Sequence, residues 1–346
     1  MPRKNRSGKI KHMLVSITKF LFEKGKGKSK HEEFQKSYDK NETRQTDYIH
    51  TYATENRYEK VVAKFSDFLK EEFNLKYVRD FKDLSTEEIY ICLDRYFEKQ
   101  RDEEHLSAST LKLHISALEK VLCTIRPSLR EYFTPENRAK WRDGVEKGDN
   151  DRYNNPDRVI ENLHKIDETS YAIAQIQRTS GARIGDVKKL VLDEENMRAY
   201  IPGSKGGRHR SIHYDHSPEE FQKLKEYKEI LDKALQEKKF SEIREEEYYK
   251  NLRKACRMAQ EPYKGSHPFR YEFAQTTYET IKELPKEEQE QYYRTILREW
   301  GRNEEDIEGK VREVKEKDML AEAIISEFLG HSRLDISLHY LKIRRK

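Results

Sequence analysis

The stretch Ala321–Tyr340, AEAIISEFLGHSRLDISLHY, decides how the rest of the chain is interpreted. Its first half is apolar at helical spacing and stops at Gly330-His331, and a glycine directly after such a run is typical of a helix end. A short second helix is predicted to follow, with Ile336 and Tyr340 on the same face. A tyrosine soon after a loop histidine and near the chain end suggests a mobile nucleophile, although a core tyrosine beside an ordinary loop histidine would have the same pattern.

The composition sets limits on the kind of protein. The chain has 346 residues, which is enough for two or three domains with buried cores. Charged residues make up 38% of the chain and apolar residues 35%, so that much of each helix must face solvent. Basic and acidic residues, 69 and 64, nearly cancel to a net charge of +5. Affinity for nucleic acid must therefore come from local clusters of charge.

Cysteine usage and hydropathy indicate a compartment. Cys92, Cys123 and Cys256 lie far apart and form no CxxC pair, so we expect reduced core residues rather than zinc ligands or disulfides. No apolar run approaches the length that spans a membrane, and the N-terminus does not have the pattern of a signal peptide. These features predict a cytoplasmic protein without a membrane partner.

The N-terminal half divides into an arm and a helical domain. Residues 1–45 are assigned to an N-terminal arm, of which residues 1–30 are basic and glycine-dotted. That composition is typical either of an arm that follows DNA phosphates or of a disordered tail that aids solubility. Residues 46–149 are predicted to form an all-helical domain, because helical periodicity begins near Thr46 and continues to about Phe133. The polar, turn-rich run Glu146–Arg158 is the expected interdomain linker. In the third predicted helix of the helical domain, Lys112 and Lys120 lie opposite the apolar face. These lysines are candidate DNA contacts.

Residues 150–346 are predicted to form a second, mostly helical domain. Its clear β signal is a hairpin made of Met197–Pro202 and Arg208–Tyr214, with Lys205 at the tip. The nearly all-charged segment 284–317 is expected to be a helical insertion. Its apolar stripe consists of Tyr293, Ile296, Leu297 and Trp300. This stripe must pack either on its own domain or on another subunit, and of the two we favour the subunit contact.

Several side chains in short motifs share one chemistry. They are Arg183 in GARIGD, Lys205 in GSKGG, His267 and Arg270 in HPFR, His331 in LGH, and Tyr340. Guanidinium groups can grip phosphate oxygens in pairs and neutralise charge in a phosphoryl transition state. A tyrosine oxygen can attack phosphorus, and lysine or histidine can move the protons. The sequence has no carboxylate or thiol cluster suited to a metal, so the set indicates attack on a phosphodiester without a metal or other cofactor.

Taken together and in this order, the motifs resemble those of the tyrosine recombinases, also called the phage-integrase family. HPFR matches the family's His-x-x-Arg box, LGHS its Leu-Gly-His-Ser box, and Tyr340 follows as its tyrosine does. The resemblance implies a mostly α fold in which two domains clamp DNA. One would be an all-helical core-binding domain, and the other a mainly helical catalytic domain with a small antiparallel β-sheet. Asp186 falls where the family carries an acidic residue, and would hold Arg183.

The resemblance also implies a reaction and its partners. Tyr340 would attack a phosphodiester of a double-stranded DNA target site, remain bonded to the 3′ phosphate and release a 5′ hydroxyl. The family implies a homotetramer acting on two sites. The arm and the insertion favour the integrase of a mobile element. On the hairpin, Arg208 is a further candidate DNA contact, and Arg208 or Arg210 could take the role assigned to Lys205.

Two other functions use similar residues. A type IB topoisomerase-like enzyme would relax one duplex without a partner site, and a catalytically inactive relative would bind DNA as a regulator. The sequence also departs from the family's pattern. Tyr271 follows Arg270 where the family often has histidine, and the interval between Arg270 and His331 is longer than is usual.

Overall fold

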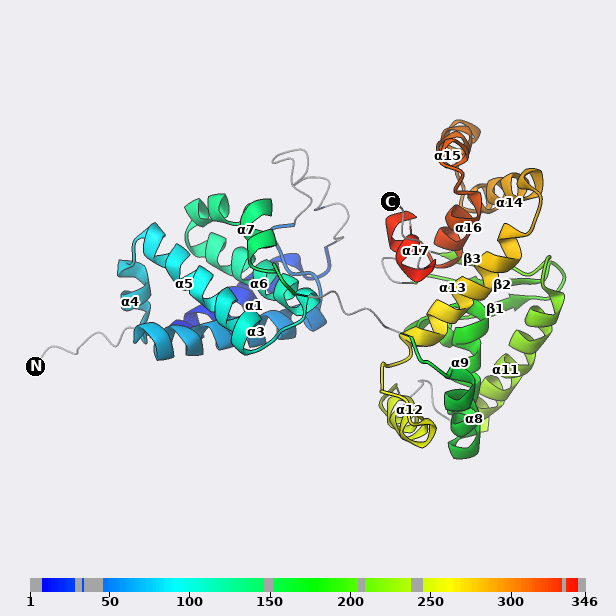
Figure 1. Cartoon of the computed structure of the whole chain (residues 1–346), viewed down its shortest axis with the longest axis horizontal. Coiled ribbons are helices and arrows are strands. Elements are labelled where there is room, and N and C mark those ends of the chain that lie inside the picture. The colour runs from blue at the N-terminus through cyan, green and yellow to red at the C-terminus, as the bar shows by residue number, and fades with distance from the viewer. Residues whose placement is uncertain are drawn as a thin grey trace, which may run out of the picture. The chain divides into compact units, whose positions relative to one another are not determined.

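The computed structural model describes residues 8–28, 33, 46–145, 152–204, 209–237, 245–331 and 334–341, and in the last range the side chains of Leu334, Leu338, Tyr340 and Leu341. The chain divides into two compact units, Met1–Asp149 and Asn150–Lys346, each described here by itself (Figure 1). Within the described ranges the regular structure is helical apart from one small antiparallel sheet, which confirms the mostly α class. The DNA clamp stays a prediction.

Helices make up most of the described part of the first unit. They are α1 (Ile10–Gly25), α3 (Tyr52–Phe73), α4 (Val78–Asp83), α5 (Thr86–Glu98), α6 (Ala108–Ile125) and α7 (Pro135–Lys140). Polar side chains at the N-termini explain where several of them begin. The Ser85 hydroxyl accepts from the Glu88 backbone N–H (3.1 Å), while the Glu88 carboxylate accepts from the Ser85 N–H (2.7 Å). This is the reciprocal cap that the sequence predicts for α5.

Part of the expected arm belongs to the core of this unit. Helix α1 packs along α3, and its Ile10, Leu14 and Leu21 are buried in the same cluster as Val62 and Phe65. A helix with a continuous apolar face must cover that face against another element, and α3 offers the matching one. Residues 10–25 are therefore not a free arm. The basic residues 1–7 and most of 29–45 lie outside the described ranges.

The second unit combines a three-stranded sheet with helices. Its elements are α8 (Pro156–Ile166), α9 (Glu168–Ser180), α10 (Ile184–Val187), β1 (Val191–Asp193), β2 (Arg198–Ile201), β3 (Arg210–His213), α11 (Pro218–Glu237), α12 (Glu245–Ala259), α13 (His267–Lys282), α14 (Lys286–Glu299), α15 (Glu304–Glu316), α16 (Leu320–Phe328) and α17 (Leu334–Leu341). The sheet order is β1-β2-β3, with Ala199 opposite both Leu192 and Ile212. The predicted hairpin is β2–β3.

Helix α13 lies between α9 on one side and α16 and α17 on the other (Figure 1). All nine residues of α16 are buried. Helices α9 and α16 are followed by glycines in the left-handed region of backbone conformation, Gly181 with φ 58° and Gly330 with φ 65°. A side chain is strained in that conformation, so glycine ends the helix and turns the chain there. The helix end predicted at Gly330 is confirmed, and the two turns direct Arg183 and His331 toward α13.

The charged insertion is a helical pair that packs on its own unit. Three residues of the stripe are buried in the core of the second unit, with Tyr293 3% exposed and Ile296 and Leu297 fully covered. Trp300, directly after α14, is partly buried and packs against the same core. The Tyr292 hydroxyl of the same helix donates to the His213 carbonyl oxygen of β3 (3.0 Å). The expected subunit contact is therefore wrong for these residues. The apolar stripe and the sheet lie far apart in sequence, and only folding brings them together.

Candidate active site

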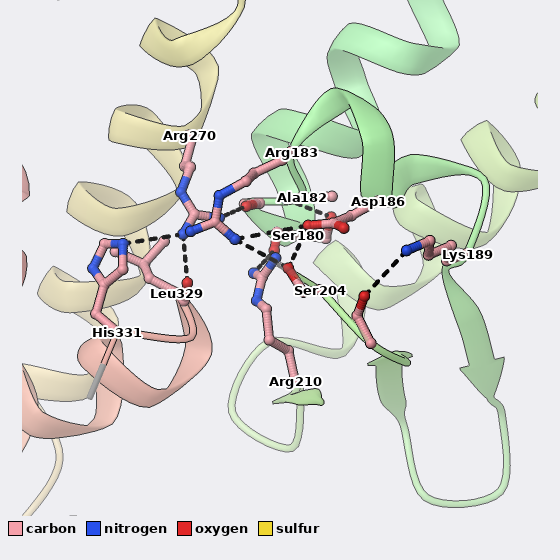
Figure 2. A network of polar contacts seen from close by, with 12 residues as sticks. Ser180, Ala182, Arg183, Asp186, Lys189, Ser204, Arg210, Arg270, Leu329 and His331 are labelled. Atoms are coloured by element: carbon pink, nitrogen blue, oxygen red, sulfur yellow. Dashed lines mark hydrogen bonds and ion pairs between the residues drawn. The ribbon is translucent and has the colours of Figure 1, made fainter. Parts of the chain in front are cut away.

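Arg270 lies at the centre of the site. It occupies the first turn of α13, where Pro268 takes an early helical position that needs no hydrogen-bond donor. Its side chain is 2% exposed. The guanidinium donates to the backbone carbonyl oxygens of Gly181 and Leu329, and one of its nitrogens lies 3.4 Å from Nε2 of His331 (Figure 2). Arg270 thus joins α13 to the ends of α9 and α16.

Arg183 approaches the same place from the other side. It directly precedes α10, and its Nη1 donates to the Ser204 hydroxyl at 3.0 Å. That hydroxyl donates in turn to Asp186 Oδ2 at 2.6 Å, while the same carboxylate oxygen lies 3.7 Å from Arg183. Asp186 thus holds Arg183 both directly and through Ser204, which the sequence analysis did not single out. The Arg183 side chain stays 30% exposed and can reach a ligand.

A third arginine, Arg210 of β3, completes the cluster. It is fully buried, and its Nε donates to the Phe328 carbonyl oxygen (2.7 Å) while Nη2 donates to that of Ser180 (3.0 Å). Figure 2 shows its guanidinium beside those of Arg183 and Arg270. From the sequence alone, Arg210 is expected only as an alternative to Lys205. Alternation along β3 could have found it, because Arg210 shares a strand face with the buried Ile212.

His331 and Tyr340 close the other end of the site. His331 follows α16 and is 9% exposed. Burial, with the positive charges of Arg270 and Arg183 next in effect, lowers the pKa of His331 to about 3, so its ring is neutral at pH 7. Tyr340, on α17, is 6% exposed, and its hydroxyl lies 3.3 Å from Nε2 of the exposed His267. The Arg270 guanidinium carbon lies 5.7 Å from the Tyr340 ring centre.

The charges in the cluster do not balance. Within the described part of the chain, Asp186 is the carboxylate that all three guanidinium groups have as a neighbour. In the described ranges, no carboxylate lies within ion-pair distance of Arg210 or Arg270, whose contacts are mainly carbonyl oxygens. Burial, followed by the charge of Arg183, lowers the pKa of Arg270 to about 10. A buried, uncompensated positive charge is costly, so the site is suited to an anion with several oxygens.

Two of the predicted site residues lie outside the described residues. Lys205 and Arg208 belong to the tip of the β2–β3 hairpin, of which residues 205–208 are not described. The roles predicted for them stay predictions. The hairpin itself ends close to the site, because Ser204 at the end of the described part contacts Arg183 and Asp186.

The candidate DNA contacts on α6 have different surroundings. Lys112 is exposed, as expected. The Lys120 ammonium instead donates to the backbone carbonyl oxygens of Thr46 and Tyr48, and so it stabilises the segment before α3. His114 lies on this helix too, but it is buried beside the Tyr96 hydroxyl (3.0 Å), and burial lowers its pKa to about 4. The expected solvent-facing surface of α6 is therefore smaller than its charge pattern indicated.

Other sequence-based expectations concern metals, membranes and cysteines. Among the described residues, no group of three or more His, Cys, Asp or Glu side chains is placed to hold a metal ion. None of the helices in the described part of the chain has both the length and the apolar character for crossing a membrane. Cys92, Cys123 and Cys256 are buried and unpaired, as expected.

Comparisons with known proteins found a weak structural similarity and no sequence match. No protein-family model matches the chain, and no curated protein matches it either. The chain is similar to a solved structure of XerA recombinase, with an alignment that covers 96% of this chain and 94% of that one. The sequence identity is 16% and the TM-score 0.35, both of which are low. The site geometry is therefore the firmer guide to function.

Proposed function

We propose that this chain is a DNA strand-exchange enzyme of the tyrosine-recombinase type, with Tyr340 as its nucleophile. The observation that carries the proposal is the position of Arg270. Its guanidinium is buried, has no carboxylate partner among the described residues, and lies against the ring of a tyrosine whose hydroxyl meets a histidine. A bound phosphodiester would supply the missing negative charge and present its phosphorus to the tyrosine oxygen.

The cluster supplies hydrogen-bond donors for such a phosphate. Arg183 and Arg270 would hold non-bridging oxygens and stabilise the charge that grows on them in the transition state. His331 adds a third donor. Its Nε2 faces an Arg270 N–H and accepts from it, so the proton of the neutral ring is on Nδ1. Nδ1 is buried and has no hydrogen-bond partner among the described residues, so it is left to donate to the phosphate.

The proposed reaction exchanges one phosphodiester for another. The Tyr340 oxygen forms a bond to phosphorus as the bond to the 5′ oxygen breaks, which leaves a 3′-phosphotyrosine and a 5′ hydroxyl. His267 lies next to the tyrosine hydroxyl and can accept its proton. Lys205 would protonate the leaving oxygen. Attack by the 5′ hydroxyl of a partner strand reverses the step, so no external energy source is consumed.

The finer parts of the proposal rest on the resemblance of the motifs. They are the double-stranded target sites, the tetramer that joins two of them, and service to a mobile element. The same motifs also suit relaxation of a single duplex. An observation that favours strand exchange over relaxation would be adduct formation restricted to a short sequence, because relaxation needs no sequence preference.

Covalent trapping tests the proposal directly. Nicked duplexes with a randomised central sequence lose a short fragment after cleavage, so the protein remains attached to DNA. We expect adducts enriched in one sequence, mapped to Tyr340 by peptide mass and abolished by Tyr340→Phe. Arg183→Ala and Arg270→Ala should each slow adduct formation on the order of a hundred- to a thousandfold. Adducts without sequence preference would favour a topoisomerase. Sequence-specific binding without any adduct would favour a regulator.

A further inference from the structure

Two residues outside the candidate catalytic set contact Tyr340, the proposed nucleophile. Tyr271 follows Arg270 in α13 and is 5% exposed. Its ring stacks on that of Tyr340, with ring centres 4.4 Å apart and planes inclined by 27°. Such stacking stabilises the ring pair beyond the burial of the rings. The Tyr271 ring therefore fixes the plane of the Tyr340 ring.

Arg152 approaches both tyrosines from the segment that precedes α8. Its guanidinium carbon lies 5.3 Å from the Tyr271 ring centre, a cation–π contact. One of its N–H groups donates to the backbone carbonyl oxygen of Tyr340. The Arg152 carbonyl oxygen in turn accepts from the Lys264 ammonium, which holds this segment in place. Arg152 thus contacts the backbone of the nucleophile and also the ring on which the nucleophile stacks.

Helix α17 needs contacts of this kind. It spans Leu334–Leu341, and a helix of about two turns is not stable by itself in water. The position of the Tyr340 oxygen therefore depends on what α17 packs against. A small displacement of a reacting atom can slow a reaction on the order of a hundredfold.

We propose that Arg152 and Tyr271 are positioning residues that hold Tyr340 for attack. Tyr271 orients the ring by stacking, and Arg152 anchors the backbone of α17 while it covers the Tyr271 ring. Neither residue is assigned contact with the phosphate. The inference rests on the proposed function, because it takes Tyr340 as the nucleophile.

Single-turnover cleavage of a trapped target, with protein in excess, separates positioning from binding. We expect Tyr271→Leu and Arg152→Met to slow adduct formation about ten- to a hundredfold. Tyr271→Phe keeps the ring and should stay within a factor of about two or three, while Arg152→Lys should recover part of the rate. DNA affinity and its dependence on salt should not change, since no phosphate contact is removed.

The chain offers a matched control. Arg253 covers the ring of Tyr263 at 5.4 Å, an Arg–Tyr contact of the same kind in the same unit that does not involve Tyr340. Arg253→Met should leave the adduct rate as it is. Hydrogen exchange gives a readout besides activity: amides of residues 334–341 should exchange faster in Arg152→Met than in Arg253→Met.

The outcomes are distinct. Unchanged cleavage and exchange in both Arg152→Met and Tyr271→Leu would overturn the inference. Weaker DNA binding with a smaller salt dependence in Arg152→Met would also overturn it, by assigning Arg152 to a phosphate. If Tyr271→Leu fails to fold, the comparison of Arg152→Met with Arg152→Lys decides. If the wild-type chain forms no adduct, the proposed function is refuted instead. Hydrogen exchange at the amides of residues 334–341 would then still test whether Arg152 anchors α17.

Discussion

Arg210 and Gly330 approach each other so closely that a Cβ atom on the glycine would lie 3.0 Å from Cδ of the arginine. The arginine is fully buried and donates to the carbonyl oxygen of Phe328, two residues before the glycine. A strand of the sheet thus sets the turn that presents His331. The turn at Gly330 and the buried Arg210 side chain therefore depend on each other, because each one occupies the space next to the other.

The first prediction concerns this turn. Gly330→Ala places a side chain in left-handed backbone (φ 65°) and against Arg210. We expect a loss of about 1–2 kcal/mol in the free energy of unfolding from the backbone alone, together with slower adduct formation. Urea denaturation measures the first effect. Gly309→Ala is the control, since it lies within α15 with open space around it and should be neutral or slightly stabilising. Equal stability of the two variants would contradict the close approach.

The second prediction concerns anion binding. The cluster of Arg183, Arg210 and Arg270, whose positive charge Asp186 offsets only in part, should bind sulfate or phosphate without DNA. Binding to the folded state raises the melting temperature. Sulfate also stabilises proteins in general by exclusion from their surfaces. The measurement is therefore the difference between Arg270→Met and Arg178→Met, because Arg178 is already paired with Asp157 and Glu272. Only Arg270→Met should lose the part of the rise in melting temperature that comes from anion binding at the cluster. The same response in both variants would remove the case for a phosphate site.

The third prediction concerns pH. The pKa of His331 is lowered to about 3 and that of His114 to about 4, from an ordinary value of 6.5. The unfolded chain binds these two protons at a higher pH than the folded chain does. The free energy of unfolding should therefore be unaffected by these groups above pH 6.5, and it should fall as the pH drops below 6.5 toward the pKa values of the folded state. Proton NMR should show both imidazole rings still neutral at pH 5, where an ordinary histidine is largely protonated. A midpoint near 6.5 for His331 would mean that the cluster does not surround it as described.

The fourth prediction concerns the insertion. Ile296 of α14 is fully buried in the core of its own unit, so Ile296→Ala should cost about 2–5 kcal/mol in the free energy of unfolding. Arg312→Ala on the exposed face of α15 should change it by less than about 0.5 kcal/mol. A normal melting temperature combined with loss of assembly in Ile296→Ala would instead restore the subunit contact that the sequence analysis expected.

Several features of the molecule could be predicted from sequence because they depend on neighbouring residues. The reciprocal cap of Ser85 and Glu88 starts α5, Gly330 ends α16, and the β2–β3 hairpin lies where alternation and glycine-rich turn residues placed it. Each involves contacts within a few positions along the chain, which local patterns report directly. The motif order also named Arg183, Arg270, His331 and Tyr340 before their distances were known.

Other features were decided only by tertiary packing. A charge pattern cannot tell a solvated lysine from Lys120, whose ammonium holds two carbonyl oxygens far back in the chain. An apolar stripe does not name its partner, so the surfaces that cover α1 and α14 appeared only in the fold.

The sequence by itself determined the inventory of the site: which arginines, histidines and tyrosine are present, and in which motifs. The tertiary structure decided that Arg210 lies buried under the His331 turn and that Arg152 and Tyr271 contact Tyr340. These contacts join segments distant in sequence, from residue 210 to 328 and from residue 152 to 340. The physical reason is that such pairs depend on how whole helices and strands pack, and no local pattern of residues encodes that packing.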